Sequence, residues 1–309
     1  MKAKVSGTKK KINGTTFLLM ITILLFVVMY AAGMIVFNDK GFAKPQMFLN
    51  LFISNAGLLV IAMGETIVMI TAGIDISVGS VTALVCMVAA NQMENHGASA
   101  YTSLLMALVI GLLFGLVQGF LVSYLEIQPF IVSLAGMFFR RGMTSIISTD
   151  MISIKNKTFF AWANYKIYLP IGSYSRRGKF IPAYIYPTVI IAILIFIVVL
   201  DGLLAGCGGF LFCLNSCSGF VEQAKGLEMD AISASVIGGT LLSGGVGTPF
   251  GTVFGVLIKG TISSLITTQG TLSSWWVRIA LSALLCFFIV LRALSCMTSV
   301  TCRCLFVFL

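Results

Sequence analysis

Long apolar segments separated by short polar stretches follow one another along almost the whole chain. The first, residues 17–37, has about 20 residues, enough for a helix to cross the hydrocarbon core of a bilayer. Only 10% of the 309 residues are charged and 58% are hydrophobic, whereas a soluble domain has about 25% charged residues. The chain has too few charged side chains to cover a water-facing surface, so it requires lipid as its solvent.

Further apolar segments lie at 48–71, 76–90, 101–124, 130–148, 184–200, 203–221, 231–248, 250–268 and 276–294. Two of them, 76–90 and 231–248, are short and contain glycine. This pattern is typical of broken or re-entrant helices, which line a cavity or pack inside protein. We therefore predict an all-α integral membrane protein, a polytopic helical bundle of about 8–10 transmembrane or re-entrant helices.

The formal charge of +10 is concentrated beside the predicted spans. Lysines are frequent in residues 1–16, and six basic residues lie in the long polar loop 150–183. Lys and Arg beside spans set orientation and contact anionic lipid headgroups. We expect membrane lipid and no nucleic acid as partners of these charges. Residues 1–16 are interpreted as a cytoplasmic basic N-terminus before an uncleaved first span, in a multi-pass protein of the bacterial inner membrane.

Two rules disagree about the side of the membrane on which loop 150–183 lies. Its excess of basic residues predicts the cytoplasm. Counting each earlier apolar segment as a span predicts the outside, because five crossings precede the loop. The disagreement disappears if 48–71 and 76–90 together cross only once.

Charged residues inside apolar segments are the first candidates for function. Glu65, Asp75, Arg140 and Arg141 are such residues, and a charge at mid-bilayer costs several kcal/mol unless it is paired or faces water. Asp75 has two readings. It either caps a helix that begins at Ile76 and pairs with an arginine, or lines a conduit and contacts substrate.

Two sets of glycines recur at every fourth residue, each giving one helix face a smooth stripe. Static helix packing and a sliding or dimerising surface both explain such stripes. The helix-packing candidates are Gly111, Gly115, Gly119, Gly247, Gly251 and Gly255.

Three ordered motifs carry a family resemblance. Residues 72–80, Ala-Gly-Ile-Asp-Ile-Ser-Val-Gly-Ser, resemble the Gly-Gly-Ile-Asp-Leu-Ser-Val-Gly-Ser signature of ribose- and galactoside-type sugar ABC transporter permeases. Residues 128–142 resemble that family's Pro-Phe-Ile-Val-Thr-Leu…Arg-Gly segment, and 230–245 resemble its second hallmark. Residues 270–276, Gly-Thr-Leu-Ser-Ser-Trp-Trp, are similar to the galactofuranose-type members in particular.

The resemblance implies that residues 17–294 form a transmembrane permease domain that makes the translocation pathway of a sugar importer. Its expected partners are a cytoplasmic ABC ATPase, a periplasmic sugar-binding protein and a second permease subunit in a dimer. The motif residues that it assigns to translocation are Gly73, Asp75, Ser77, Gly79, Ser80, Pro129, Phe130, Arg141, Asp230, Gly238, Gly239 and Thr240.

The residues themselves predict a transporter subunit rather than an enzyme. No Gly-x-x-x-x-Gly-Lys-Ser/Thr loop occurs in the sequence, so ATP hydrolysis is expected on a separate chain. One histidine and cysteines mostly within apolar segments give no zinc-like spacing and no catalytic constellation. We expect no metal and no cofactor.

Two features depart from the resemblance. Family members carry a few dozen residues, including a helix that docks on the ATPase, where this chain continues directly through 200–202, an apparent internal deletion. The tail 295–309 is atypical. Sugar transport is therefore expected to be impaired. Three alternatives stay open: a branched-chain amino-acid ABC permease, a non-transporting remnant or scaffold, and an ion-driven secondary transporter.

Overall fold

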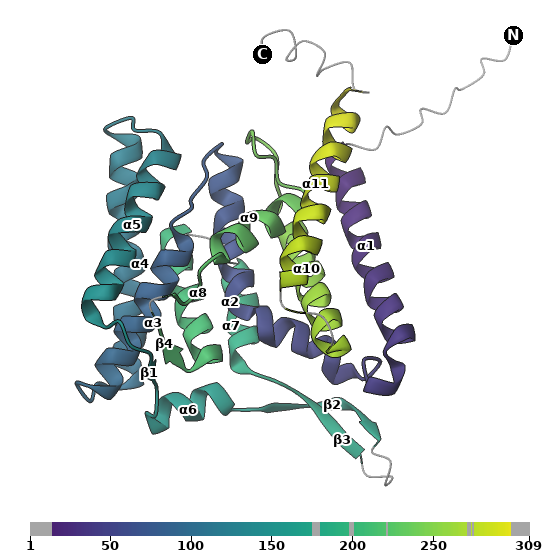
Figure 1. The fold of residues 1–309 in the computed structure, drawn as a ribbon, viewed down its shortest axis with the longest axis horizontal. Helices are drawn as coiled ribbons and strands as arrows, with labels where there is room; N and C mark the ends of the chain where they lie inside the picture. Colours follow the sequence, from purple (N-terminus) through teal and green to yellow (C-terminus); the bar gives the residue numbers. More distant parts are fainter. Residues whose placement is uncertain are drawn as a thin grey trace, which may run out of the picture.

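Each predicted apolar segment contains a helix. The computed structural model describes residues 14–174, 180–197, 201–220, 222–270, 273 and 275–297. The helices are α1 (Gly14–Val36), α2 (Pro45–Ile70), α3 (Val78–Glu94), α4 (Ala100–Ser123), α5 (Pro129–Ile147), α7 (Pro187–Ile197), α8 (Asp201–Ser216), α9 (Leu227–Ile237), α10 (Pro249–Gln269) and α11 (Trp275–Met297) (Figure 1). Five of them, α1, α2, α4, α5 and α10, are long and apolar enough to cross a membrane. The predicted all-α polytopic membrane fold is confirmed.

Local sequence signals explain where several helices begin and end. Proline occupies the first turn of α2, α5 and α10, where its missing N–H group has no helical partner to lose. Ser99 caps α4 by accepting a hydrogen bond from the Thr102 N–H group, and Thr248 caps α10 through the Gly251 N–H group. Gly270 ends α10 in the left-handed conformation that glycine adopts without strain.

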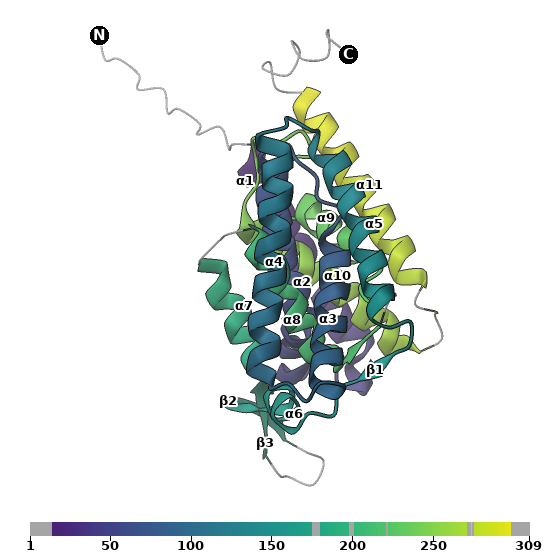
Figure 2. The ribbon, with the colours of Figure 1, turned by 90° about the vertical axis from the view of Figure 1, so that its left-hand side faces the viewer.

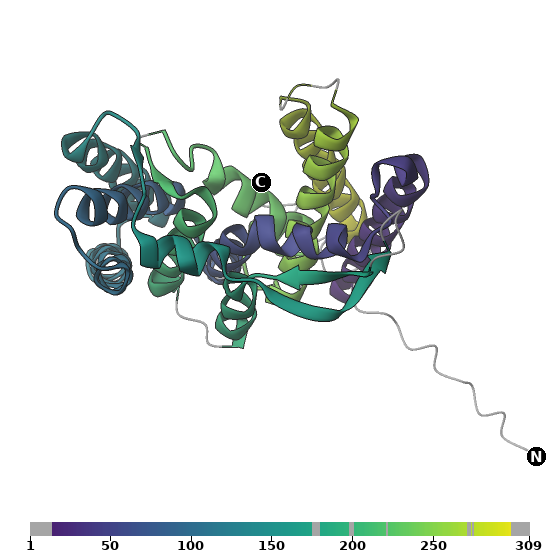
Figure 3. The ribbon, with the colours of Figure 1, turned by 90° about the horizontal axis from the view of Figure 1, so that it is seen from below.

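Helix α2 lies at the centre of the bundle, and its buried residues extend from Leu51 to Met69. Seen from below, α3, α4 and α5 form one group and α1, α10 and α11 another, with α8 and α9 beside α2 between them (Figure 3). One apolar core joins α2, α3, α8 and α9. A second core joins α1, α10 and α11 around Phe26, Leu257 and Phe288.

The loop 150–183 is more structured than predicted. It contains α6 (Lys157–Asn164) and an antiparallel hairpin of β2 (Ile167–Tyr174) and β3 (Phe180–Ile185). A second small sheet pairs β1 (Ile152–Ser153) with β4 (Ser218–Gly219). The side chain of Gln46 at the start of α2 both donates to and accepts from the backbone of Tyr184. A short 3₁₀ helix, η1 (Asn38–Lys40), leads from α1 toward α2.

The start of α1 and the β2–β3 hairpin lie at opposite ends of the bundle (Figure 1). This is the arrangement that an odd number of crossings before the loop requires. The N-terminal residues 1–13 and the tail residues 298–309 lie outside the described residues, so most of the predicted N-terminus and of the atypical tail is not part of this description.

Helices α7 and α8 are short. Helix α7 has 11 residues and α8 has 16, whereas a full span needs about 20. Helix α7 packs against α2, and Figure 2 shows it as a shorter helix than α4. Of the predicted discontinuity near 200–202, residue 200 lies outside the described residues and 201–202 begin α8.

Candidate translocation site

The first motif forms the break between α2 and α3. Asp75 accepts hydrogen bonds from the backbone N–H and the hydroxyl of Ser77, at 2.7 Å and 2.5 Å. Helix α3 begins at Val78, two residues after the expected start at Ile76, which was therefore wrong. The Asp75 carboxylate nevertheless makes the hydrogen bond expected of a cap, since it accepts from the N–H group two residues on.

A polar network joins this break to α4 and α5. The amide of Gln118 on α4 donates to the Ser77 hydroxyl at 3.1 Å. The Nε of Arg140 on α5 donates to the Ser80 hydroxyl at 3.2 Å, and that hydroxyl bonds the Ser77 carbonyl. Three segments distant in sequence therefore meet at Ser77 and Ser80.

Arg140 is the charged residue at the centre of this network. Its side chain is fully buried, and Nη1 and Nη2 have no hydrogen-bond partner among the described residues. The guanidinium lies 4.8 Å from the centroid of the Phe114 ring, a cation–π contact. A Cβ at Gly136 would lie 2.7 Å from Nη2, so glycine one turn earlier gives the guanidinium its space. Asp75 is the opposite charge that attracts it.

Glu65 supports the same break from α2. It is fully buried, and its carboxylate accepts a hydrogen bond from the Asp75 N–H group at 3.3 Å. Ala72, where the family signature has glycine, has φ 62°, a left-handed conformation that strains any residue with a Cβ. Gly73 is buried against Val68, and its N–H group donates to the Val68 carbonyl.

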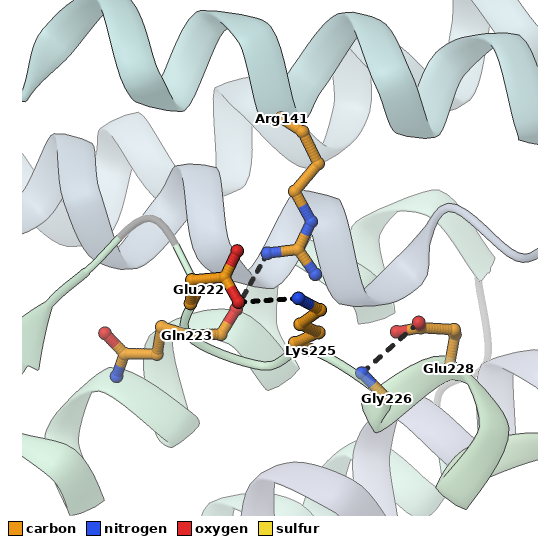
Figure 4. Close-up of polar contacts among 6 residues, drawn as sticks. All are labelled: Arg141, Glu222, Gln223, Lys225, Gly226 and Glu228. Carbon is orange, nitrogen blue, oxygen red and sulfur yellow. Dashed lines mark hydrogen bonds and ion pairs between the residues drawn. The ribbon is translucent and has the colours of Figure 1, made fainter. Parts of the chain in front are cut away.

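The segment before α9 lies against both α5 and α3. Arg141 reaches from α5 to donate to the Gln223 carbonyl at 3.1 Å, and Lys225 pairs with Glu222 at 2.7 Å (Figure 4). The hydrogen bond from Lys225 lowers the pKa of Glu222, with the attraction of the ammonium adding to it. Glu228 accepts a hydrogen bond from the Gly226 N–H group at 3.2 Å.

Gly79 and Asp230 also have close partners. A Cβ at Gly79 would collide with the Glu228 carboxylate, so the glycine lets α3 and α9 approach closely at this point. Asp230 forms an ion pair of 3.1 Å with Lys259 on α10, and both side chains are partly buried. The structure thus gives Asp230 a helix-to-helix contact.

The second motif ends α9 and begins the break before α10. A Cβ at Gly251 would overlap the Gly238 carbonyl, and one at Gly255 would overlap the Ala234 carbonyl. Helices α9 and α10 therefore cross with their backbones in contact. Gly239 has φ 107°, and Thr240 is fully buried with its N–H group bonded to the Ser235 carbonyl.

The two breaks pack on each other. The Gly245 N–H group donates to the Ile70 carbonyl at 2.8 Å. A Cβ at Gly244 would lie 2.7 Å from the Ala72 backbone nitrogen, and one at Gly247 would lie 2.8 Å from the Ile70 side chain. The interrupted segments of the two halves of the chain therefore lie against each other.

A cavity of about 420 Å³ lies between the first break, α4 and α5. Gly111, Gly115 and Gly119 contribute to its wall. Gly111 also contacts α8, since a Cβ at Gly206 would lie 3.2 Å from its Cα, whereas a Cβ at Gly119 would have no atom within 4 Å. Pro129 lines the cavity at the start of α5, and the neighbouring Phe130 is 43% exposed.

Three residues of this site lay outside the predicted site set: Gln118, Arg140 and Glu228. Arg140 carried a signal, as a charge within an apolar segment. Gln118 and Glu228 carried none, because their role depends on which helices become neighbours.

Comparison with known proteins identifies the family. The profile of the branched-chain amino acid transport system / permease component matches residues 47–200 and 190–290. The inner membrane ABC transporter permease protein YjfF of Escherichia coli is 36% identical over 303 residues, covering 89% of this chain and 91% of that protein. The fructose import permease protein FruG of Bifidobacterium longum is 26% identical over 94% of this chain and 95% of its own length. The autoinducer 2 import system permease protein LsrC of Yersinia pestis is 29% identical over 77% of this chain and 74% of its own length.

No solved structure matches the chain. The family profile covers well over half of its residues, and a relative above 30% identity aligns with most of its length. With its membrane-spanning helices, the chain belongs to the family of multi-pass inner-membrane permease components of ABC transporters.

Proposed function

We propose that this chain is the membrane-spanning permease subunit of an ATP-driven importer for a sugar of the galactofuranose, ribose or galactoside kind. The observation that carries the proposal is the similarity along almost the whole chain to permeases that include a fructose importer. The sequence motifs at 72–80 and 230–245 support the same substrate class.

The geometry of the two breaks supports a translocation role. Many transporters have their substrate site where interrupted helices of two halves meet, and irregular backbone at membrane depth is tolerated where it is buried in protein or lines a cavity. Here Gly245 of the 238–248 break donates a hydrogen bond to the carbonyl of Ile70, the last residue of α2 before the 71–77 break. We assign the residues around this junction, with Asp75 and Ser77 foremost, to shaping the pathway.

Three partners complete the proposed importer. A separate ABC ATPase would bind the cytoplasmic side, and a periplasmic sugar-binding protein would deliver substrate. If residues 1–16 are cytoplasmic, the β2–β3 hairpin faces the periplasm, since it lies at the opposite end of the bundle (Figure 1). A second permease subunit would form the dimeric pore.

A second candidate, a permease uncoupled from ATP, is favoured by the sequence between the apolar segments 184–200 and 203–221, which are separated by Asp201 and Gly202 alone. The family profile matches in two pieces that overlap at 190–200. These observations support the loss of a segment that would otherwise extend to the ATPase.

The family's description also names branched-chain amino acids. We favour sugar over an amino acid because the motifs and the FruG relative both point to it. Substrate specificity is therefore the property to test first.

Uptake of labelled ribose, galactose, fructose and leucine tests this assignment. The cells would carry the chain with its cognate ATPase and binding protein, and the chain would have the corresponding segment of the E. coli relative restored between Ile197 and Asp201. We expect uptake of one of the sugars and none of leucine. The Asp75→Asn variant, with its amount in the membrane measured separately, is expected to assemble poorly or transport poorly. Leucine uptake alone, or full sugar uptake by the Asp75→Asn chain, would contradict the assignment.

A further inference from the structure

The cavity between the first break, α4 and α5 has the size of a small-molecule site. Its volume of about 420 Å³ falls within the range of about 300–1,000 Å³ that is usual for such sites. Its wall is largely apolar and includes the ring of Phe114, and its polar residues are Thr71, Asp75, Gln118, Ser123 and Ser133. Small-molecule sites share this combination of an apolar wall and a few placed polar groups.

The polar groups supply both hydrogen-bond donors and acceptors. Gln118 uses one N–H group on Ser77 and has a second N–H group and a carbonyl oxygen besides. Asp75 has two carboxylate oxygens, of which Oδ1 accepts both hydrogen bonds from Ser77. Ser133 bonds the carbonyl groups of Ile74 and Phe130, and its oxygen can still accept. Hydroxyl groups, which donate and accept, match such a wall.

The charges beside the cavity balance. Arg140 lies over the Phe114 ring on the side of α5, with two nitrogens that have no hydrogen-bond partner among the described residues. It attracts the Asp75 carboxylate. Asp75 is the one charged side chain among the described residues that line the cavity, and the positive charge of Arg140 behind the Phe114 ring offsets it, so an ion gains little from entering. An uncharged ligand does not lose hydration of a formal charge on entering.

We infer that this cavity, bounded by Asp75, Phe114 and Gln118, binds a single uncharged monosaccharide inside the permease. The inference rests on the proposed function for its substrate class. The hydroxyl groups of the sugar would bond Asp75 and Gln118, and the C–H face of its ring would pack on Phe114.

Equilibrium binding to the purified full chain in lipid nanodiscs tests the inference. The probes are radiolabelled galactose and ribose, with galacturonate and galactose 6-phosphate as charged competitors. We expect saturable binding of one neutral sugar that neither charged competitor displaces. The absence of saturable binding would overturn the inference, and so would displacement by a charged competitor at the same concentration as by the neutral sugar.

Two matched pairs of variants locate the site. A Cβ at Gly119 or at Gly142 would meet no atom within 4 Å, but only Gly119 lines the cavity. Gly119→Leu should lower the affinity at least about tenfold by filling the cavity, and Gly142→Leu should leave it unchanged. Gln118→Met should weaken binding about 3- to 10-fold through one lost hydrogen bond, whereas Gln269→Met on exposed α10 surface should not. Equal effects within either pair would place the sugar elsewhere.

This test separates the inference from the proposed function. Binding to the purified chain requires neither the ATPase nor the binding protein. Sugar uptake without binding in the nanodisc would overturn the cavity site alone. Binding together with uptake of leucine but no sugar would overturn the proposed function and keep the site.

Discussion

The two breaks in the bundle are stabilised in different ways. The 71–77 break depends on side chains, since the Ser77 hydroxyl donates to Asp75 and accepts from Gln118 beside the buried Arg140. The 238–248 break depends on glycines, three of which have positive φ, namely Gly239, Gly244 and Gly245. Its neighbouring helices touch backbone to backbone at Gly238 and Gly251.

This difference separates adaptable from rigid elements of the pathway. A backbone crossing with no side chain between the helices has one way to pack and leaves no space. A network of side chains beside a cavity can exchange partners when a ligand enters. We therefore assign ligand contact to the first break and support to the second, and the following predictions test this division from the largest expected effect to the smallest.

Gly251→Leu should cause the largest loss. Any side chain at this position overlaps the Gly238 carbonyl, and overpacking that moves backbone costs about 3 kcal/mol or more. The free energy of unfolding in mixed micelles and the yield of folded protein measure the effect. Gly142→Leu is the matched control, since a Cβ there meets no atom within 4 Å. A Gly251→Leu chain as stable as this control would contradict the close crossing.

Removing either charge of the first break should cost less. Asp75→Asn and Arg140→Met each leave one charge without its opposite. We expect each variant to lower the free energy of unfolding by about 1–3 kcal/mol. The stability loss of the double variant should be smaller than the sum of the two single losses, by about 0.5–3 kcal/mol. Unfolding of the four chains in one detergent measures this coupling. Simple additivity would mean that Asp75 and Arg140 do not stabilise each other.

Ala72→Gly should stabilise the chain by about 0.5–1 kcal/mol. Ala72 has φ 62°, which costs an alanine about 1–2 kcal/mol, and glycine removes that strain while it loses more backbone freedom on folding. Ala72→Val should destabilise, because a β-branched side chain tolerates positive φ least. The melting temperatures of both variants provide the check. A lower melting temperature for Ala72→Gly would contradict the left-handed conformation of Ala72.

Replacing Glu222 by glutamine should have the smallest effect on stability, and this effect should be visible only in how stability depends on pH. Lys225 lowers the pKa of Glu222 in the folded chain. The Glu222–Lys225 pair therefore stabilises the folded state at pH values above the ordinary pKa of a glutamate. That contribution is lost as the pH falls through the lowered pKa. The stability difference between the native chain and Glu222→Gln should therefore vanish in acid, and a difference that grows as the pH falls would contradict the pairing.

Helix positions were largely predictable from the sequence, because lipid requires long apolar segments and leaves few other solutions. The start of α3 was missed by two residues, since Asp75 and Ser77 both suit the end of a helix. The β2–β3 hairpin was not predicted. Its place depends on the bonds between Gln46 and Tyr184, which join residues far apart in sequence.

The site was predictable only in part. The motif positions 75, 77 and 80 could be named from the resemblance, but not their partners Gln118 and Arg140. Both Gly111 and Gly119 line the cavity, but glycine spacing could not show that Gly111 also contacts α8 whereas a Cβ at Gly119 meets no atom within 4 Å. A stripe shows which residues share a face, whereas the neighbour of that face is decided by the packing of the whole bundle.

ATP-driven uptake by the native chain, compared with the chain that has the relative's segment restored between Ile197 and Asp201, tests the central claim most directly. Both chains would be expressed with the same ATPase and binding protein, and their amounts in the membrane matched. The account predicts sugar uptake by the restored chain and uptake near background by the native chain, because the sequence between the apolar segments 184–200 and 203–221 has no room for the segment that would dock on the ATPase. Vigorous ATP-dependent uptake by the native chain would contradict it.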